Sequence, residues 1–282
     1  MITIAITGAT GQLGRLAIAA LKTRAPDARL IALVRDPAKA ADLGIEARTF
    51  DYARPEGLAG ALAGVETLVL ISSSDFNDRA GQHRNVIAAA KAAGVGRILY
   101  TSILKGAESP MLIALDHIAT EVALADSGLA HTILRNGWYA ENFTGSLAGA
   151  LAAGAVVGAN PSGPVSAAAR ADYAEALAVA ALDPSLSGAV LELAADDAFT
   201  MAEFAAEVSR QVGRTIPYAA MPQSAYADLL QSFGLPEGFA KVLADSDARA
   251  KEGALFDDSR TLSRLIGRPT TPVARVIAAA LG

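Results

Sequence analysis

The 282-residue chain contains no cysteine, which excludes disulfide scaffolds, thiolate-bound zinc and a cysteine nucleophile. Histidine is scarce as well. The three histidines are His83, His117 and His131, and no two of them stand at the spacing of metal ligands. We therefore expect no metal site.

Charge is also limited, since only 19% of the residues are Asp, Glu, Lys or Arg and the net charge is −5. Nucleic acids and anionic membranes are bound by clustered Lys and Arg, which this composition does not favour. No apolar run approaches the roughly 20 residues that span a bilayer, and no basic segment precedes the short apolar run at the N-terminus. We expect a cytoplasmic protein that binds neither nucleic acid nor membrane.

Apolar residues are abundant, at 52% of the chain, so the protein can bury a large core. In the first half, short runs rich in β-branched residues alternate with alanine-rich stretches. The expected strands are Ile2–Ile6, Arg29–Val34, Ala47–Phe50, Val65–Ile71, Arg97–Thr101 and Ala130–Leu134, and the expected helices are Gln12–Arg24, Pro37–Leu43, Gly57–Ala63, Gln82–Ala93 and Ile118–Asp126. This alternation predicts an α/β fold with a Rossmann-type, doubly wound parallel sheet.

The pattern changes after about residue 142. A turn at Asn160–Gly163 follows a short expected strand, and the chain continues with a helix at Arg170–Leu182, a strand at Ala189–Leu193 and a helix at Met201–Val212. The last third is helical and interrupted by prolines. We expect a dinucleotide-binding domain over residues 1–142 and a smaller, mainly helical substrate-side lobe over residues 143–282, with some segments returning to the sheet.

A glycine-rich motif, Gly8-Ala9-Thr10-Gly11-Gln12-Leu13-Gly14, directly follows the first expected strand and opens the first helix. Gly8 permits a tight turn, Gly11 lets the backbone approach a pyrophosphate, and Gly14 lets the helix pack against the sheet. The free N–H groups at the start of the helix can then bind the anion. A dinucleotide site is the reading that this context favours, and a glycine turn without a ligand is the alternative.

The end of the second strand bears on the choice of dinucleotide. NAD sites usually carry an acidic residue about 20 positions beyond the glycines, whereas Arg35 stands 21 positions after Gly14. A guanidinium at this place suits the 2′-phosphate of NADPH. The alternatives are that Arg35 is only a solvated charge, or that Asp36 supports NADH.

Familiar catalytic motifs are missing. None of the six tyrosines is followed four residues later by a lysine, so the tyrosine–lysine couple of many short-chain reductases is absent, which weakens an epimerase or dehydratase assignment. The chain also contains no G-x-S-x-G, H-E-x-x-H or Walker lysine motif. Hydrolysis and phosphoryl transfer are therefore disfavoured.

A set of motifs nevertheless occurs in one order along the whole chain. They are Gly8–Gly14, Arg35, Ile71–Ser74, Gln82–Asn85, Tyr100–Ser102, Asp116-His117, Leu134–Asn142, Arg170–Tyr173, Leu243–Asp247 and Leu255–Ser259. In these motifs the chain resembles the NmrA-like branch of the atypical short-chain dehydrogenases, and within it the bacterial NADPH:quinone oxidoreductases of type 2, with triphenylmethane reductases as near relatives. The resemblance implies hydride transfer from NADPH to a small quinone without flavin or metal.

Candidate cofactor-binding residues combine this resemblance with the glycine motif. They are Gly8, Thr10, Gly11, Gln12, Leu13, Gly14, Arg35, Ile71, Ser72, Ser73, Asn136, Gly137, Trp138, Tyr139, Glu141, Asn142 and Arg170. Alternatives stay open for several of them. Ser72 and Ser73 also suit strand-end capping, Trp138 suits packing, and Glu141 and Asn142 suit hydrogen bonds to loop amides.

His117 and Tyr139 are the candidate catalytic residues. A histidine can donate to, or protonate, a developing quinone oxyanion near neutral pH, although His117 is equally compatible with a hydrogen bond to a loop. His83 and His131 are expected to be structural. The alternative function is an NADP-binding, redox-sensing regulator of the NmrA type, and a homodimer is left open.

Overall fold

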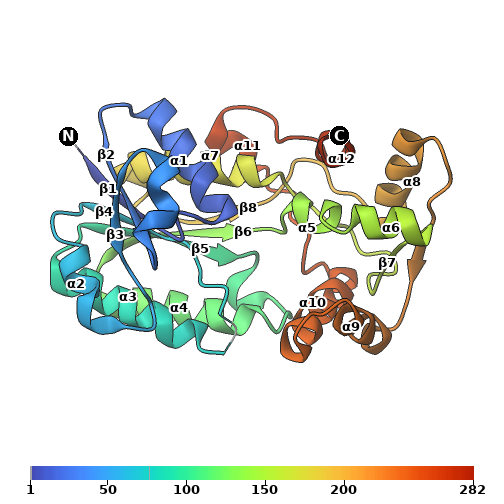
Figure 1. The fold of residues 1–282 in the computed structure, drawn as a ribbon, viewed down its shortest axis with the longest axis horizontal. Helices are drawn as coiled ribbons and strands as arrows, with labels where there is room; N and C mark the ends of the chain where they lie inside the picture. The colour runs from blue at the N-terminus through green and yellow to red at the C-terminus, as the bar shows by residue number, and fades with distance from the viewer. Residues whose placement is uncertain (1, 76) are drawn as a thin grey trace. The chain divides into compact units, whose positions relative to one another are not determined.

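The predicted alternation of strands and helices forms a seven-stranded sheet in the computed structural model, which describes residues 2–75 and 77–282 (Figure 1). Its strands are β1 (Thr3–Thr7), β2 (Arg29–Val34), β3 (Glu46–Thr49), β4 (Thr67–Leu70), β5 (Arg97–Ile103), β6 (Ala130–Asn136) and β8 (Val190–Leu193). Their order is β3-β2-β1-β4-β5-β6-β8, and the pairs from β3 to β5 are all parallel. The predicted α/β class is confirmed.

Helices cover both faces of this sheet, as a doubly wound fold requires. Figure 1 shows α1 (Gln12–Arg24) and α7 (Arg170–Leu182) over one face, and α3 (Arg79–Ala93) and α4 (Ala114–Ser127) over the other. The chain winds outward from β1 to β3 and then returns to β4 on the other side of β1. The carboxyl ends of β1 and β4 therefore form the switch point at which sheets of this kind bind ligands.

The sheet packs through alternate residues, because successive side chains of a strand point to opposite faces. Leu68 and Leu70 of β4 and Ile98 and Tyr100 of β5 are fully buried in one cluster with Val86 of α3. Strands covered on both sides need few polar residues, which explains the near-continuous apolar runs in the sequence.

Two short helical segments lie between the strands. Pro37–Leu43, predicted as a helix, is a 3-10 helix, and α2 (Leu58–Ala61) is shorter than the predicted Gly57–Ala63. The side chain of Asp36 begins the 3-10 helix by accepting a hydrogen bond from the Ala38 N–H at 3.1 Å.

The chain divides into two compact units. The first contains Met1–Ile103, Asp116–Arg135 and Arg170–Leu191, and the second contains Leu104–Leu115, Asn136–Ala169 and Glu192–Gly282. The second unit contains α5 (Ala140–Thr144), α6 (Leu147–Ala153), β7 (Val156–Gly158), α8 (Met201–Val212), β9 (Tyr218–Ala220), α9 (Gln223–Ser232), α10 (Glu237–Arg249), α11 (Thr261–Ile266) and α12 (Val273–Leu281). None of the described helices is long and apolar enough to cross a membrane.

The Asp-Ser-Asp motif of α10 joins distant segments of the second unit. Asp245 accepts a hydrogen bond from the Leu112 N–H at 2.8 Å. Asp247 accepts from the N–H groups of Ala159 and Asn160, at the end of β7. The two aspartates of this motif, which is one of those that carry the family resemblance, therefore hold backbone segments of the second unit in place.

Gly14 is where helix α1 meets the turn that precedes it. A Cβ atom at this position would lie 2.3 Å from the Gly8 carbonyl oxygen and 2.8 Å from Ala9 Cα. The sequence predicted that Gly14 lets the helix pack against the sheet, whereas the nearest atoms that a Cβ would meet belong to the backbone of the glycine turn.

We predict that Gly14→Ala destabilises the protein, because the methyl group collides with backbone that has no room to move. The loss should be about 1–3 kcal/mol or more, and it should outweigh the gain of about 1 kcal/mol in helix propensity. Gly60→Ala in α2 is the matched control, since a Cβ there meets no atom within 4 Å. Urea unfolding of both variants gives the comparison, and equal stabilities would contradict the steric argument.

Candidate functional site

The glycine turn leaves the N-terminus of α1 open. Gly8 has φ +57°, a conformation that glycine adopts readily, and its carbonyl accepts the Gly11 N–H at 2.9 Å. Gly11 is the N-cap residue and supplies no side-chain cap, so the first helical N–H groups, including those of Gln12 and Leu13, have no such partner. Thr10 contributes its carbonyl, which accepts from Arg15 Nε at 3.1 Å. An anion would complete this helix terminus.

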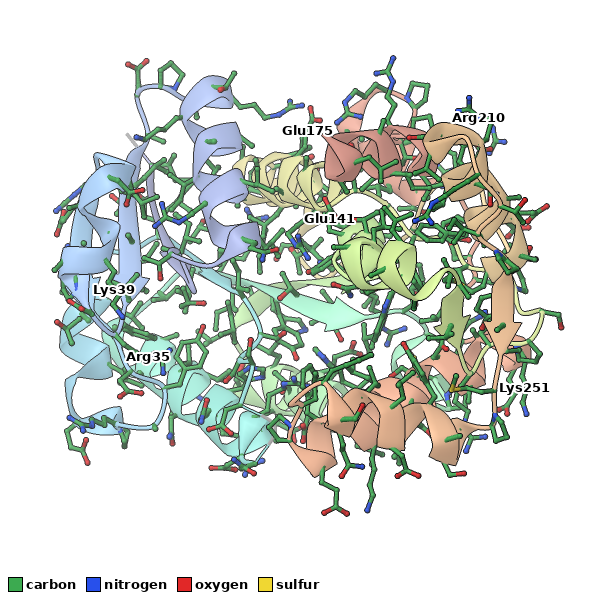
Figure 2. The ribbon with its side chains drawn as sticks, turned by 45° about the vertical axis from the view of Figure 1, so that its right-hand side comes forward. Arg35, Lys39, Glu141, Glu175, Arg210 and Lys251 are labelled. Atoms are coloured by element: carbon green, nitrogen blue, oxygen red, sulfur yellow. The ribbon has the colours of Figure 1, made fainter. Side chains whose placement is uncertain are left out.

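Two exposed cations follow the carboxyl end of β2. Arg35 and Lys39 make no side-chain hydrogen bond or ion pair with the described residues, and Figure 2 shows both in the same region of the chain. Lys39 was not predicted as a site residue, although its position four residues after Arg35 could have indicated it. Asp36, the alternative that would support NADH, accepts a hydrogen bond from the Ala38 N–H through one of its two carboxylate oxygens, at 3.1 Å.

The two predicted serines at the end of β4 differ in their hydrogen bonding. Ser73 is engaged internally, because its hydroxyl donates to Gln82 Oε1 at 2.7 Å and its N–H donates to His83 Nε2 at 2.9 Å. These bonds match the capping alternative for Ser73. The Ser72 hydroxyl, in contrast, has no hydrogen-bond partner among the residues that the structure describes. Ile71, which precedes it, lies against the glycine turn, with its Cβ 3.6 Å from the place of a Cβ on Gly8.

Four rings follow one another in a row, of which Tyr52 is half-buried and His83, Tyr100 and His117 are buried. Neighbouring ring centroids are 6.1 Å apart for Tyr52 and His83, 5.4 Å for His83 and Tyr100, and 5.9 Å for Tyr100 and His117. The buried Arg79 guanidinium belongs to the same region and lies 3.8 Å from the Asp116 carboxylate.

His117 is buried, with 5% of its surface exposed, and its Nδ1 lies 2.7 Å from the Tyr100 hydroxyl. Its partner is therefore a strand residue and not the loop considered from sequence. Burial lowers the pKa of His117 to about 3, with Arg79 and His83 adding to the effect. At pH 7 the ring is neutral, so it can donate a hydrogen bond but does not carry a second proton to give away.

The other two histidines are held by internal hydrogen bonds. Burial, followed by the charge of Arg79, lowers the pKa of His83 to about 3. His131 Nδ1 lies 2.9 Å from the Leu129 carbonyl oxygen.

Among the described residues, no three or more His, Asp or Glu side chains form a group that could hold a metal ion.

The remaining predicted residues, apart from Arg170, lie in the second unit, around the end of β6 and the start of α5. Asn136 is buried, and its side-chain oxygen has no hydrogen-bond partner among the described residues. The Gly137 N–H donates to the Leu193 carbonyl at 2.7 Å. Trp138 and Tyr139 are half-buried, and Tyr139 is the N-cap residue of α5.

Glu141 and Asn142 continue into α5. Asn142 is exposed and donates its N–H to the Tyr139 carbonyl at 2.9 Å. Glu141 lines a cavity of about 390 Å³ together with Thr144, Ala169, Thr271, Arg275, Val276, Ala279 and Ala280.

Arg170 is half-buried at the start of α7, in the first unit. The two catalytic candidates are thus on different units, His117 on the first and Tyr139 on the second.

A doubly wound sheet with an open glycine turn at its switch point is the architecture of dinucleotide-binding proteins. The chain belongs to the NmrA-like family, whose model matches residues 2–271.

It is similar to quinone oxidoreductase 2 of Escherichia coli, with 50% identity over 97% of both chains. The crystal structure of the NADPH-dependent quinone oxidoreductase from Escherichia coli, complexed with NADPH, has 49% identity, covers 99% of this chain and 100% of that one, and superposes with a TM-score of 0.96. The triphenylmethane reductase of Citrobacter sp., complexed with NADP(H), has 34% identity, covers 98% of this chain and 99% of that one, and has a TM-score of 0.92.

We predict that acid destabilises the protein through His83 and His117. Both pKa values lie below the ordinary value of 6.5, so between pH 6.5 and about 3 the unfolded chain binds protons that the folded chain does not. Lowering the pH through this window therefore favours unfolding. Each histidine should reduce the free energy of unfolding by about 2 kcal/mol between pH 7.5 and pH 5.0.

Urea unfolding at the two pH values measures this effect. His83→Gln should have a pH dependence smaller than that of the wild type by about 2 kcal/mol. Val86→Ala is the control for destabilisation without a change in titration, and its pH dependence should equal that of the wild type. If His83→Gln kept the full pH dependence, His83 would not be buried in its neutral form.

Proposed function

We propose that the protein catalyses the NADPH-dependent reduction of quinones by direct hydride transfer, without flavin or metal. The observation that carries the proposal is the 50% identity with quinone oxidoreductase 2 over 97% of both chains. The crystal structure of a related quinone oxidoreductase with NADPH, to which this chain is similar along its whole length, supports the choice of cofactor.

The residues of this chain fit NADPH at separate places. The open N-terminus of α1 suits the pyrophosphate. Arg35, which has no side-chain partner among the described residues, and Lys39, four positions later, suit the 2′-phosphate. The buried side-chain oxygen of Asn136 lacks a donor among the described residues, and an amide or hydroxyl of the cofactor would supply one.

NADPH, when bound, supplies the hydride, and a quinone that accepts a hydride and one proton becomes a hydroquinone. The developing charge is on the quinone oxygen, and hydrogen-bond donors aimed at that oxygen lower the barrier. If Tyr100 donates to Nδ1 of His117, the proton of the neutral ring is on Nε2, and that N–H is the donor we assign to the oxyanion. We assign to the Tyr139 hydroxyl a second hydrogen bond to the same quinone oxygen. The proton that completes the hydroquinone comes from water.

We predict that Arg35→Ala reduces the affinity for NADPH by about ten- to a hundredfold, because one charge-assisted contact to the 2′-phosphate is lost. The affinity for NADH, which has no such phosphate, should change by less than threefold. Titration of both cofactors into the wild type, Arg35→Ala and Lys251→Ala makes the comparison. Lys251 is an exposed cation of the second unit, and its variant has the same net charge (Figure 2). Equal affinities of the wild type for NADPH and NADH would overturn the assignment.

We also predict that the purified protein oxidises NADPH when a small benzoquinone is added, with no added flavin or metal. Tyr139→Phe and His117→Asn should each reduce kcat about a hundredfold with little change in NADPH affinity. Asparagine places a polar atom near the position of Nδ1, so it can keep the Tyr100 hydrogen bond while the Nε2 donor is removed. Tyr226→Phe, which removes a half-buried hydroxyl elsewhere in the second unit, is the control.

Two results would separate the alternatives. If both catalytic variants stayed within about threefold of the wild type, positioning of the reactants would account for the rate and our donor assignments would be wrong. If the wild type bound NADPH tightly but reduced no quinone, an NADP-binding redox sensor would be the better description.

A further inference from the structure

The segment Ile71–Ser73, which follows β4, is held by side chains from four separate parts of the chain. The bonds, in order, are Ile71 N–H to Thr7 Oγ1 at 2.9 Å, Tyr52 Oη to the Ile71 carbonyl at 2.9 Å, Ser72 N–H to Thr101 Oγ1 at 2.9 Å, Ser73 N–H to His83 Nε2 at 2.9 Å, Arg79 Nε to the Ser73 carbonyl at 2.7 Å, and Ser73 Oγ to Gln82 Oε1 at 2.7 Å. Such a density of side-chain bonds to irregular backbone is unusual, since most backbone groups bond within secondary structure.

Three of these bonds come from one face of helix α3. Arg79, Gln82 and His83 are spaced i, i+3 and i+4, which places them side by side on the helix. All three are buried, with exposed fractions of 4%, 8% and 0%. Buried polar side chains are costly unless they are fully engaged, and here much of their hydrogen bonding is directed at a single residue, Ser73.

The hydrogen bonds define the protonation of His83. The Ser73 N–H can only donate, so Nε2 must be unprotonated and act as the acceptor. On the other side of the ring, Nδ1 lies 2.9 Å from Thr120 Oγ1, whose own proton goes to the Asp116 carbonyl at 2.8 Å. Nδ1 therefore carries the ring proton. A leucine at this position would leave the Ser73 N–H without its acceptor, whereas a glutamine could place an oxygen where Nε2 lies.

The rigid segment presents one side chain that takes no part in holding it. The Ser72 hydroxyl has no partner among the described residues, while the hydrogen-bonding groups on both sides of it are fixed. Ile71 packs beside Gly8, so Ser72 belongs to the switch-point edge where β1 and β4 end. A hydroxyl held in place in advance loses little entropy when it binds a ligand.

We propose that Arg79, Gln82 and His83 are positioning residues that hold Ser72 for a direct hydrogen bond to NADPH, and that Ser73 is part of this support and not a ligand. This inference rests on the proposed function. It assigns a role to the Gln82-His83 motif, which the family resemblance included without explaining. The clamp, meaning Arg79, Gln82 and His83, acts on cofactor binding and not on the hydride-transfer step.

Binding of NADPH and steady-state quinone reduction, measured on the whole protein, test the clamp. We expect His83→Leu to raise the Kd and KM for NADPH about tenfold, while kcat at saturating NADPH stays within about threefold of the wild type. His83→Gln should restore the Kd to within about threefold. Val86→Ala, one turn further along α3, controls for loss of stability and should bind NADPH as the wild type does.

A second pair of variants tests the contact itself without disturbing the core. Ser72→Ala removes a hydroxyl that has no hydrogen-bond partner among the described residues, so it should leave the melting temperature unchanged and raise the Kd for NADPH about five- to tenfold. Ser74→Ala is the matched control, because Ser74 is two residues later and exposed. It should change neither the melting temperature nor the Kd for NADPH.

The outcomes distinguish this inference from the proposed function. If the wild type binds NADPH and reduces quinone, but His83→Leu and Ser72→Ala bind NADPH as tightly as the wild type, the clamp is wrong and the function stands. If His83→Leu does not fold, the Ser72→Ala result decides, with unchanged affinity overturning the inference. If the wild type binds no NADPH, both the function and the clamp fall.

Discussion

The hydroxyl of Thr7 joins the two strand ends between which the chain reverses its direction of winding. It accepts the Ile71 N–H at 2.9 Å and so connects the carboxyl ends of β1 and β4. The glycine turn begins one residue later, and Gly8 packs against Ile71 on the same edge. The same hydroxyl thus fixes the glycine turn and the strand end that bears Ser72 and Ser73 relative to each other, and the geometry of the candidate site in the first unit depends on it.

The sequence predicted much of this unit because its signals are local. The bounds of α1 and β2 agree with the prediction residue for residue, since glycine and charged residues mark their ends. Strand β9 was not predicted, because three residues are too few to show a period. The support of Ser73 by His83 could not be predicted either, since it depends on a tautomer that only the surrounding hydrogen bonds define.

His117 illustrates how burial changes the chemistry that a residue type suggests. From sequence, a histidine near the expected active edge could serve as an acid around neutral pH. In the structure, the low-dielectric surroundings and the nearby Arg79 keep the ring neutral, which limits it to hydrogen bonding. The buried guanidinium of Arg79, 3.8 Å from the Asp116 carboxylate, therefore lowers the pKa of two histidines at once.

Asp36 and Arg35 are neighbours with different tasks. Asp36 caps the 3-10 helix by accepting the Ala38 N–H, and Arg35 is the residue that we propose for cofactor binding. The carboxylate stabilises the start of the 3-10 helix, while the exposed Arg35 next to it makes no side-chain hydrogen bond or ion pair with the described residues. Under the role that we propose for Arg35, cofactor preference depends on an exposed side chain whose replacement leaves the core untouched. Such an arrangement lets selection change the preferred nicotinamide cofactor through single substitutions at the surface, at little risk to folding.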